Sequence, residues 1–445
     1  MDISHRARTD GASCRALADG VIRNGTFDSG RADKMNTSGY ETTALACFFV
    51  QSPLLAQNDD DAAYLFPDIP DAWAQAVRYK NEHFSAAFLF GGLIDYTTFD
   101  QDQQSIDQVG EQENTLEARS VRFLFAGTLD FIGPWAYVVA VESNRFDQAT
   151  ESPALTVMDA AVMRSFAGGA SRLKIGKQKQ AFVYEMVGDS ANLVQHERFL
   201  GPFFAARSWG VSYAHTFKEK RLGLQLGWYN DWFEDGGSFS GQGNQLAFRL
   251  TGLPLWRDEG ATLFHVGISA RYQEDENDFL HYRGRPGSNV ADFYVDSGSF
   301  EADYSLHLGL EALWQGRNLT VLGEYTKASV TAESVGNPQF DGFYVTASYV
   351  FNGELRPYNT TVRYSRRVIP GSGWGALEPF AWFGRLDLDD AAISGGRMDK
   401  WSVGLNWWAT RRWKMSIGHG DIELDRFGVV GITRQTLFRI QWIGP

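Results

Sequence analysis

From Phe84 to the end of the chain, apolar residues recur at every second position, and this alternation constrains the fold more than any other feature. In residues 304–314, Leu306, Leu308 and Leu310 alternate with serine, histidine and glycine. A period of two is typical of a β-strand with one apolar and one polar face. About sixteen segments show this pattern. They lie at 84–99, 115–130, 132–145, 155–166, 169–178, 204–218, 220–234, 242–255, 262–272, 304–314, 317–330, 338–351, 376–388, 401–407, 413–418 and 438–442.

The length of these segments separates a membrane barrel from a soluble sandwich. Most have roughly ten to fifteen residues, whereas a globular strand usually has about five or six, and about ten suffice to cross a bilayer. The turns at 132–134 and 411–412 are short, whereas 273–299 and 352–375 are long and polar. Short turns on one side and long loops on the other are typical of outer-membrane barrels. We therefore predict an all-β fold, a transmembrane antiparallel β-barrel of about 16 strands, over residues 84–445.

Composition excludes several other classes of protein. Of the 445 residues, 44% are hydrophobic, and no stretch is long and apolar enough for a bundle of membrane helices. The net charge of -13 argues against nucleic-acid binding, which needs a basic face. Cys14 and Cys47 are the two cysteines, so we expect neither a disulfide framework nor a cysteine-based zinc site. A soluble, secreted β protein that binds polysaccharide remains an alternative.

The first 83 residues lack the strand pattern. Residues 1–34 are polar, and an apolar run at 42–57 resembles the core and cleavage end of a secretory signal. We interpret 1–57 as a disordered extension with a signal peptide. Residues 58–83 are then expected to form a periplasmic segment with one short helix at 71–80.

No catalytic or metal-binding motif stands out. The eight histidines are dispersed, without the spacings of zinc enzymes, and no Gly-x-Ser-x-Gly elbow or phosphate-binding glycine loop is found. We therefore expect no enzyme activity, no cofactor and no metal. A hydrolase built into the barrel wall remains an alternative, because a triad assembled from neighbouring strands leaves no sequence spacing. His265 and His307 fall on lumen faces, where we interpret them as hydrogen-bonded or solvated wall residues.

Basic residues cluster where the strand pattern breaks. Four bases occur in residues 172–179 with no acid among them. Because Arg172 and Lys174 alternate with apolar residues, they are predicted to face the lumen. The cluster consists of Arg172, Lys174, Lys177 and Lys179.

Residues 182–204, directly after the cluster, lose the two-residue period and predict an irregular or partly helical insert. Non-strand backbone at membrane depth is tolerated only where it lines a cavity or is buried, so this insert is expected to fold inward and narrow the pore. Arg198 and Arg207 would then lie at the constriction. Rings of arginine and lysine at a narrow point select anions. The alternative is that these bases are solvated lumen residues that balance nearby acids.

Three motifs resemble the phosphate-selective porins of the O/P type, which are trimeric sixteen-stranded outer-membrane channels. Residues 118–129 are similar to that family's arginine-rich second strand, which ends in Gly-Thr-Leu. Residues 173–185 are similar to its Gly-Gln-Phe-Lys segment ahead of the constriction loop, which is followed here by Glu197-Arg198. The third and most specific motif runs from Phe351 through Gly371-Ser372-Gly373-Trp374-Gly375 to Gly404-Leu405-Asn406-Trp407-Trp408.

The resemblance implies passive uptake of anions, with Arg119, Arg122 and Lys179 as the matching pore bases. The sequence departs from the family pattern at Ser120, where a second arginine is usual, and at Ala181, where a proline is usual. The chain also ends in Trp-Ile-Gly-Pro rather than on a terminal aromatic residue.

Together these observations predict a homotrimeric porin in the outer membrane of a Gram-negative bacterium, in contact with its lipid and lipopolysaccharide. It would pass small anions, phosphate or polyphosphate above all, with a porin lacking phosphate preference as the alternative. The predicted anion pathway consists of Arg119, Arg122, Arg172, Lys174, Lys177, Lys179, Arg198 and Arg207.

Overall fold

The computed structural model describes residues 77–131, 133, 135–143, 155–230, 243–274, 279–353, 355–371 and 373–444. The predicted signal peptide and extension at 1–57 lie outside these described residues. Within them, no helix is both long and apolar enough to cross a membrane.

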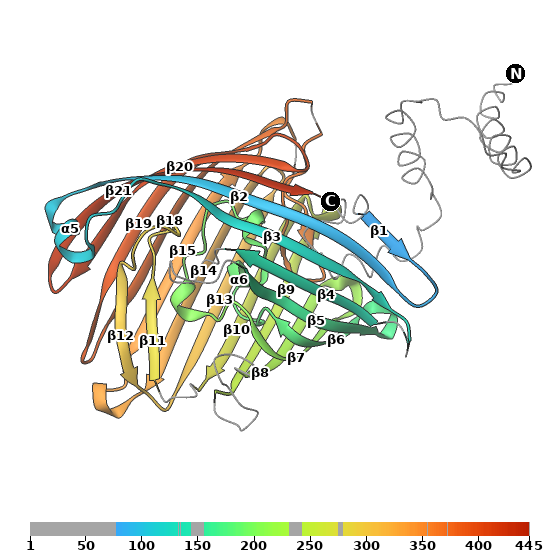
Figure 1. Cartoon of the computed structure of the whole chain (residues 1–445), viewed down its shortest axis with the longest axis horizontal. Helices are drawn as coiled ribbons and strands as arrows, with labels where there is room; N and C mark the ends of the chain where they lie inside the picture. The colour runs from blue at the N-terminus through green and yellow to red at the C-terminus, as the bar shows by residue number, and fades with distance from the viewer. Residues whose placement is uncertain are drawn as a thin grey trace, which may run out of the picture. The chain divides into compact units, whose positions relative to one another are not determined.

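Sixteen strands form one closed antiparallel sheet (Figure 1). Each strand pairs with its neighbour along the chain, and the last pairs with the first, with Ile94 opposite Ile440. The predicted barrel of about 16 strands is therefore confirmed. The strands are β2 (Ser85–Gln101), β3 (Thr115–Leu129), β4 (Trp135–Ser143), β5 (Thr156–Phe166), β6 (Ser171–Gln178), β7 (Ser208–Thr216), β8 (Leu222–Asn230), β9 (Gln245–Arg257), β10 (Thr262–Gln273), β13 (Tyr304–Gly316), β14 (Leu319–Thr331), β15 (Gln339–Tyr349), β18 (Ala376–Asp390), β19 (Ile393–Trp408), β20 (Trp413–Arg426) and β21 (Val429–Gly444).

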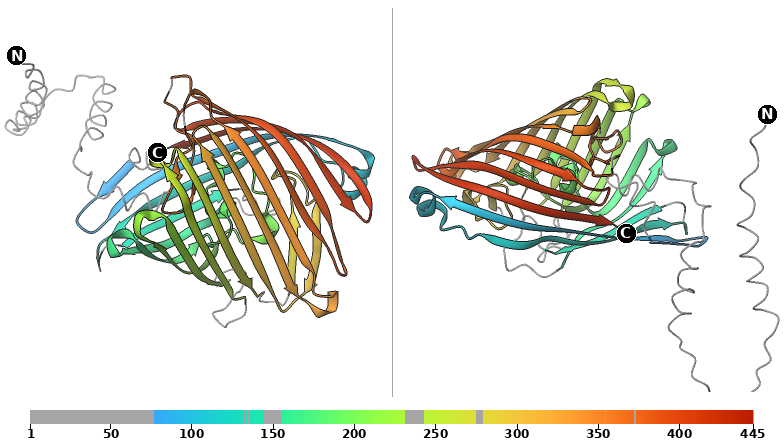
Figure 2. Two further views of the ribbon diagram at one scale, coloured as in Figure 1. Left: turned by 180° about the vertical axis from the view of Figure 1, so that it is seen from behind. Right: turned by 90° about the horizontal axis from the view of Figure 1, so that it is seen from above.

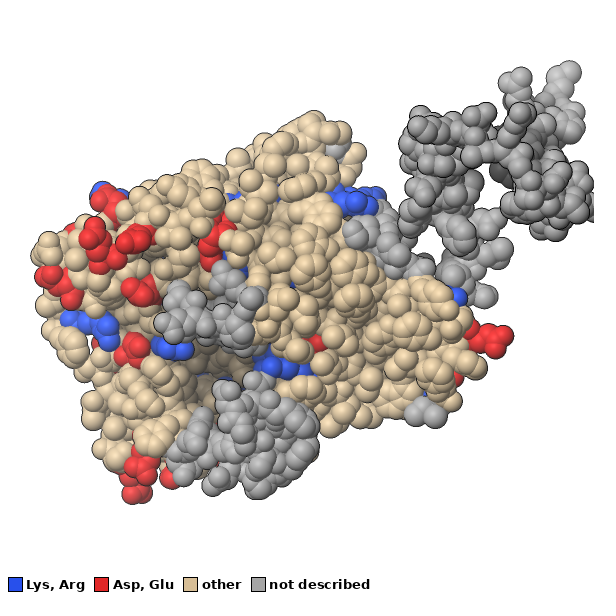
Figure 3. Space-filling model, in the orientation of Figure 1, with Lys and Arg blue, Asp and Glu red and all other residues tan. Residues whose placement is uncertain are grey.

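The two faces of the wall differ as the alternation predicts. On β13, Leu306, Leu308 and Leu310 face outward and are 42 to 54% exposed, whereas Ser305 and His307 face inward and are fully buried. Apolar side chains outside and polar ones inside are the arrangement of a membrane barrel. Most of the surface visible in Figure 3 is uncharged, and charged side chains gather at the end that carries α5 (Gln103–Val109).

The two ends of the barrel carry connections of different length. We call the end where β2 begins the N-terminal rim and the opposite end the loop rim. The turns 167–170 and 317–318 are short and lie at the N-terminal rim, whereas 179–207 and 274–303 lie at the loop rim. Residues 350–375 break this pattern, because strand direction places them at the N-terminal rim, where the turn lengths predicted a short turn. The length of a connection alone therefore does not tell at which rim it lies.

One prediction near the N-terminus fails at the residues that the structure describes. Val77–Lys80, at the end of the predicted helix, forms strand β1, and the rest of that helix lies outside the described residues. The start of β2 extends beyond the end of β21, and β1 pairs with this otherwise open edge. Helix α5, between β2 and β3, was not predicted.

The lumen is largely filled by three segments. From the loop rim, residues 179–207, here called the insert, cross the barrel, and their backbone N–H groups at Tyr184 and Glu185 donate to Glu324 on β14. This confirms the predicted inward-folded insert. A hairpin also enters from the loop rim and lies against β18 and β19 (Figure 1). The short elements are α6 (Tyr184–Val187), η2 (Ser190–Asn192) and η3 (Gly201–Phe203) in the insert, and β11 (Phe279–Gly284) and β12 (Val295–Glu301) in the hairpin.

The third segment, residues 350–375, enters from the N-terminal rim and is here called the rim segment. It meets the insert in mid-lumen, where Arg356 Nη1 donates to the carbonyl of Asn192 at 2.9 Å. The backbone N–H of Ser365 donates to the Tyr184 hydroxyl at 2.5 Å. Seen from behind, the strands coloured green to red form the wall around these segments (Figure 2).

Candidate functional site

Two larger cavities lie inside the barrel among the described residues. One of about 380 Å³ opens toward the loop rim, between the insert, β3 and the β11–β12 hairpin. The other, of about 250 Å³, lies toward the N-terminal rim, between the insert and strands β2–β8. Four residues line both cavities, and we call them the neck: Arg122, Lys179, Asp189 and Arg207.

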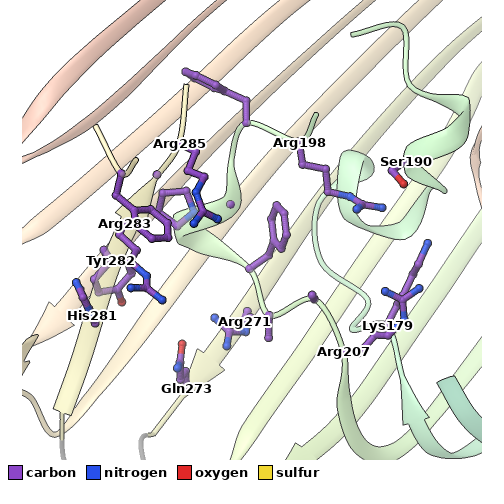
Figure 4. A pocket seen from close by; sticks show the side chains of 18 of the residues that line it. Lys179, Ser190, Arg198, Arg207, Arg271, Gln273, His281, Tyr282, Arg283 and Arg285 are labelled. Atoms are coloured by element: carbon purple, nitrogen blue, oxygen red, sulfur yellow. The ribbon is translucent and has the colours of Figure 1, made fainter. Parts of the chain in front are cut away.

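Bases outnumber acids along this route, although the whole chain is acidic. The acids are Glu142 and Asp189 in the loop-rim cavity, and Asp159 and Asp189 in the other. Figure 4 shows bases from the insert, β10 and the hairpin around one space. The bases of the loop-rim cavity are Arg119, Arg122, Lys179, Arg198, Arg207, Arg271, Arg283 and Arg285, and those of the N-terminal-rim cavity are Arg122, Arg172, Lys174, Lys179 and Arg207.

Arg122 joins the wall to the insert at the neck. Its Nη2 donates to Glu142 on β4 at 2.9 Å, and its Nη1 lies 3.4 Å from Asp189 in the insert. Its Nε is buried without a hydrogen-bond partner. Arg122 therefore positions the insert and keeps one donor unused.

The other two neck bases contact the insert and the wall. Lys179 Nζ donates to the carbonyl of Gly188 at 2.7 Å, and Arg207 Nε donates to Asp159 at 3.0 Å. Lys174, on β6 just below the neck, makes no side-chain hydrogen bond to any described residue. A lysine carries three donors, so Lys174 retains its donors for an anion.

A buried ion network fastens the insert to the wall. Glu197 accepts two hydrogen bonds from Arg119 on β3, at 2.8 and 3.1 Å, and another from Arg439 on β21. Arg439 also donates to Asp95 on β2 at 2.6 and 2.7 Å. These charges satisfy one another, so Arg119 acts chiefly as a tether at the edge of the cavity.

A second fastening lies within the insert. The backbone N–H groups of Phe199 and Leu200 donate to the Glu185 carboxylate, at 3.0 and 2.6 Å. Arg198 donates to the carbonyls of Glu185 and Gly188, at 2.7 and 2.9 Å. Burial of Glu185 raises its pKa to about 7.

The model of one protein family, phosphate-selective porin O and P, matches residues 92–425. The chain belongs to this family. It is a porin of the outer membrane of a Gram-negative bacterium.

Solved porins share the fold at low identity. An anion-selective porin from Comamonas acidovorans is 11% identical, with a TM-score of 0.53 over 81% of this chain and 99% of that one. The outer membrane channel DcaP of Acinetobacter baumannii is also 11% identical, with a TM-score of 0.52 over 82% of this chain and 99% of that one. OmpT, an outer membrane protein of Vibrio cholerae, is 10% identical, with a TM-score of 0.50 over 83% of this chain and 100% of that one.

A curated relative from Caulobacter vibrioides, described as an uncharacterized protein, is 25% identical over 256 residues. The match covers 54% of this porin and 51% of that relative, so the porin spans about half of its length.

The porin brings together seven of the eight predicted pathway residues. Arg119 and Arg198 line the loop-rim cavity, Arg172 and Lys174 line the other, and Arg122, Lys179 and Arg207 line both. Lys177 lines neither. Because Lys174 and Gln178 both face the N-terminal-rim cavity, strand alternation turns Lys177 to the other face of β6.

Three bases of the loop-rim cavity were not predicted. Arg271 lies on the polar inner face of β10, which alternation does indicate. Arg283 lies on β11 and Arg285 directly follows that strand, and both guanidinium groups lie over the Phe293 ring, at 4.2 and 4.1 Å from its centre. Their two-residue spacing in a long acidic loop was the available signal.

The histidines form no catalytic array in the described part of the porin. His265 lies between Glu311 and Tyr358, at 2.6 and 2.7 Å, as expected of a hydrogen-bonded wall residue. Two serine–histidine pairs occur, Ser171–His215 and Ser416–His196, but neither histidine contacts a carboxylate. Across the described ranges, no group of three or more His, Cys, Asp or Glu side chains is placed to hold a metal ion.

Proposed function

We propose that this porin conducts small anions by passive diffusion, phosphate or polyphosphate among them, through the neck. The observation that carries the proposal is the charge of the route: the neck holds three bases and one acid, in a chain of net charge -13. Fixed positive charge in a narrow, low-dielectric channel replaces part of an anion's hydration and repels cations. The anion selectivity named for the Comamonas porin supports this direction.

The bases form a series rather than one tight site. Arg283 and Arg285 lie in the hairpin at the loop rim, the neck follows, and Lys174 lies beyond it. Conduction needs binding that is favourable enough for entry and weak enough for exit, and a series of partly engaged bases meets that need. No turnover chemistry is part of the proposal.

We also propose that the porin is a homotrimer surrounded by outer-membrane lipid and lipopolysaccharide. Strands β4 and β6 to β8 have eight or nine residues, whereas the wall strands from β9 onward have 11 to 16, and β4 exposes the apolar Val139 on its outer face. A low, apolar stretch of wall suits contact with a neighbouring subunit. Chemical cross-linking in mild detergent tests this, and a monomer-only pattern would contradict it.

The functional test is the reversal potential of the purified full-length porin in planar bilayers under a KCl gradient, followed by phosphate block of chloride conductance. We expect anion selectivity and block at low phosphate concentration. Lys179→Gln should lower the anion-to-cation permeability ratio, whereas Lys177→Gln, the same change on the opposite face of β6, should not. Cation selectivity would overturn the proposal. Anion selectivity without phosphate block would leave an anion porin without phosphate preference.

A further inference from the structure

One wall of the N-terminal-rim cavity is apolar. Strands β2 to β5 each present apolar side chains to it, among them Leu89, Leu124, Val138 and Met163. Strand β4 is apolar on both faces, since Val138 lines the cavity while Val139 is 43% exposed on the outside. The alternation that gives most of the barrel a polar lining is therefore lost here.

A second apolar patch on the inner wall shows what usually happens to such a surface. Leu386 and Leu388 on β18 and Met398 on β19 are fully buried, in one cluster with Tyr282 and Phe300 of the β11–β12 hairpin. In the described part of the chain, no hairpin covers the β2–β5 patch in this way. Its side chains line the 250 Å³ cavity instead.

The apolar wall lies directly beside the bases. Met163 on β5 and Lys174 on β6 are register partners in the antiparallel pair, so their Cα atoms lie about 5 Å apart. Arg172, Lys179 and Arg207 line the same cavity. A molecule in this cavity meets apolar surface on one side and positive charge on the other.

A bare hydrated phosphate gains nothing from an apolar wall, because its contacts require polar donors. An anion with an apolar body gains free energy from the same wall by removing apolar surface from water. The size also fits, since a cavity of about 150 Å³ accepts benzene in another protein. We propose that the substrate class of this porin includes organic anions that join a phosphate or carboxylate to one aromatic ring or short apolar chain.

This inference rests on the proposed anion route. The charged group contacts Lys174 and the neck bases, while the apolar body lies against Leu124, Val138 and Met163. The N-terminal-rim cavity would therefore bind such anions more tightly than inorganic phosphate because of apolar contact area, not because of charge.

The test compares phenyl phosphate with inorganic phosphate as blockers of chloride conductance in bilayers that hold the full-length porin. We expect half-block by phenyl phosphate at a concentration lower by about tenfold, as burial of part of a ring provides. Val138→Thr, which keeps the side-chain shape and replaces one methyl group with a hydroxyl, should reduce the difference to about twofold or less. Val139→Thr, the same change on the outer face of β4, is the matched control.

Met163→Gln is the second variant and keeps the inference testable if Val138→Thr assembles poorly. Equal block by the two anions in the wild type would overturn this inference while leaving the proposed function intact. If both variants kept the preference for phenyl phosphate, the apolar body would not bind to this wall of the cavity. Failure of both anions to block would count against the proposed function itself.

Discussion

The two sides of the barrel use buried basic residues differently. On the side of β9–β21, two buried arginines each face a carboxylate, Arg249 with Glu311 at 2.6 Å and Arg356 with Glu378 at 2.7 Å. Around the neck, bases outnumber acids, and Lys179 is held by carbonyl oxygens. The same residue types therefore anchor filled lumen on one side and leave positive charge facing open space on the other.

The difference teaches that pairing, more than the identity of a residue, separates scaffold from pathway. An arginine that donates two hydrogen bonds to one carboxylate stabilises the fold, and its charge is neutralised by that partner. Lys174, which makes no side-chain hydrogen bond to any described residue, keeps its donors for a passing ion. Each prediction below changes one side of this comparison.

The largest effect is expected from Glu378→Gln on the paired side. The Glu378 carboxylate accepts from Arg356, from Asn406 and from Trp408 Nε1 at 3.0 Å, and it is fully buried. Removal of its charge leaves Arg356 buried and unmatched, a loss of about 3–5 kcal/mol of unfolding free energy. Urea midpoints of the refolded porin, read by tryptophan fluorescence, measure the change. The exposed Glu423→Gln is the control, and an unchanged midpoint for Glu378→Gln would show that pairing on this side is not structural.

Glu185 is the next case, because no described arginine forms a salt bridge with its buried carboxylate. Its pKa is raised to about 7, so the folded porin retains a proton that the unfolded chain loses near pH 4.5. Stability is then greatest below about pH 4.5 and falls by about 1–3 kcal/mol as the pH rises to about 7. Glu185→Gln keeps an oxygen for the N–H groups of Phe199 and Leu200 and should flatten this dependence. Urea midpoints between pH 4 and 8 test it, with Glu333→Gln as the exposed control. A wild-type midpoint that rises across this window would contradict the assignment.

At the neck, opposite substitutions should have opposite effects. Asp189→Asn removes an acid and should raise the anion-to-cation permeability ratio, whereas Arg122→Gln removes a base and should lower it. Each change should be about threefold, since a unit charge at about 7 Å in water is worth about 0.6 kcal/mol. Reversal potentials under a KCl gradient give both ratios. Movement of both variants in the same direction would mean that the substitutions act through the position of the insert rather than through charge.

The smallest effect is expected in the loop-rim cavity, outside the neck. Arg283 lies in the loop-rim cavity, and Arg283→Gln should lower chloride conductance by less than about twofold at 0.1 M KCl, where the Debye length is about 10 Å. At 1 M KCl the Debye length falls to about 3 Å, and the chloride conductances of the wild type and Arg283→Gln should converge. A difference that persists at high salt would indicate a steric role for Arg283.

The sequence predicted the wall far better than its contents. Strand positions follow from an alternation that each segment carries locally, as β13 shows. The rim segment was assigned to the loop rim because it is long, yet its side depends on the direction of β15, which no local pattern encodes. Residues 77–80 were expected in a helix, but the open edge of β2 gives them a partner that sequence inspection does not reveal.

The pathway residues likewise divide into those that a local pattern predicts and those that depend on contacts between distant segments. Arg198 and Arg207 were predicted because the strand pattern breaks around them, and the structure brings them together near the neck. Lys177 was grouped with its neighbours by the absence of acids, although its odd spacing from Lys174 turns it away. Arg283 and Arg285 reach the cavity through a hairpin that folds back into the barrel, a contact between segments that alternation along one strand cannot indicate.

The meeting of the insert and the rim segment has a consequence for the order of assembly. Asn192 and Arg356 are joined across the lumen, yet they are separated by more than a third of the chain and enter from opposite rims. Neither can dock until the strands between them are in place, so this contact is of the kind that forms late in folding. We expect the nascent porin to pass through a wide, leaky intermediate whose wall is complete before its lumen narrows. A cell that makes this protein must keep that intermediate brief.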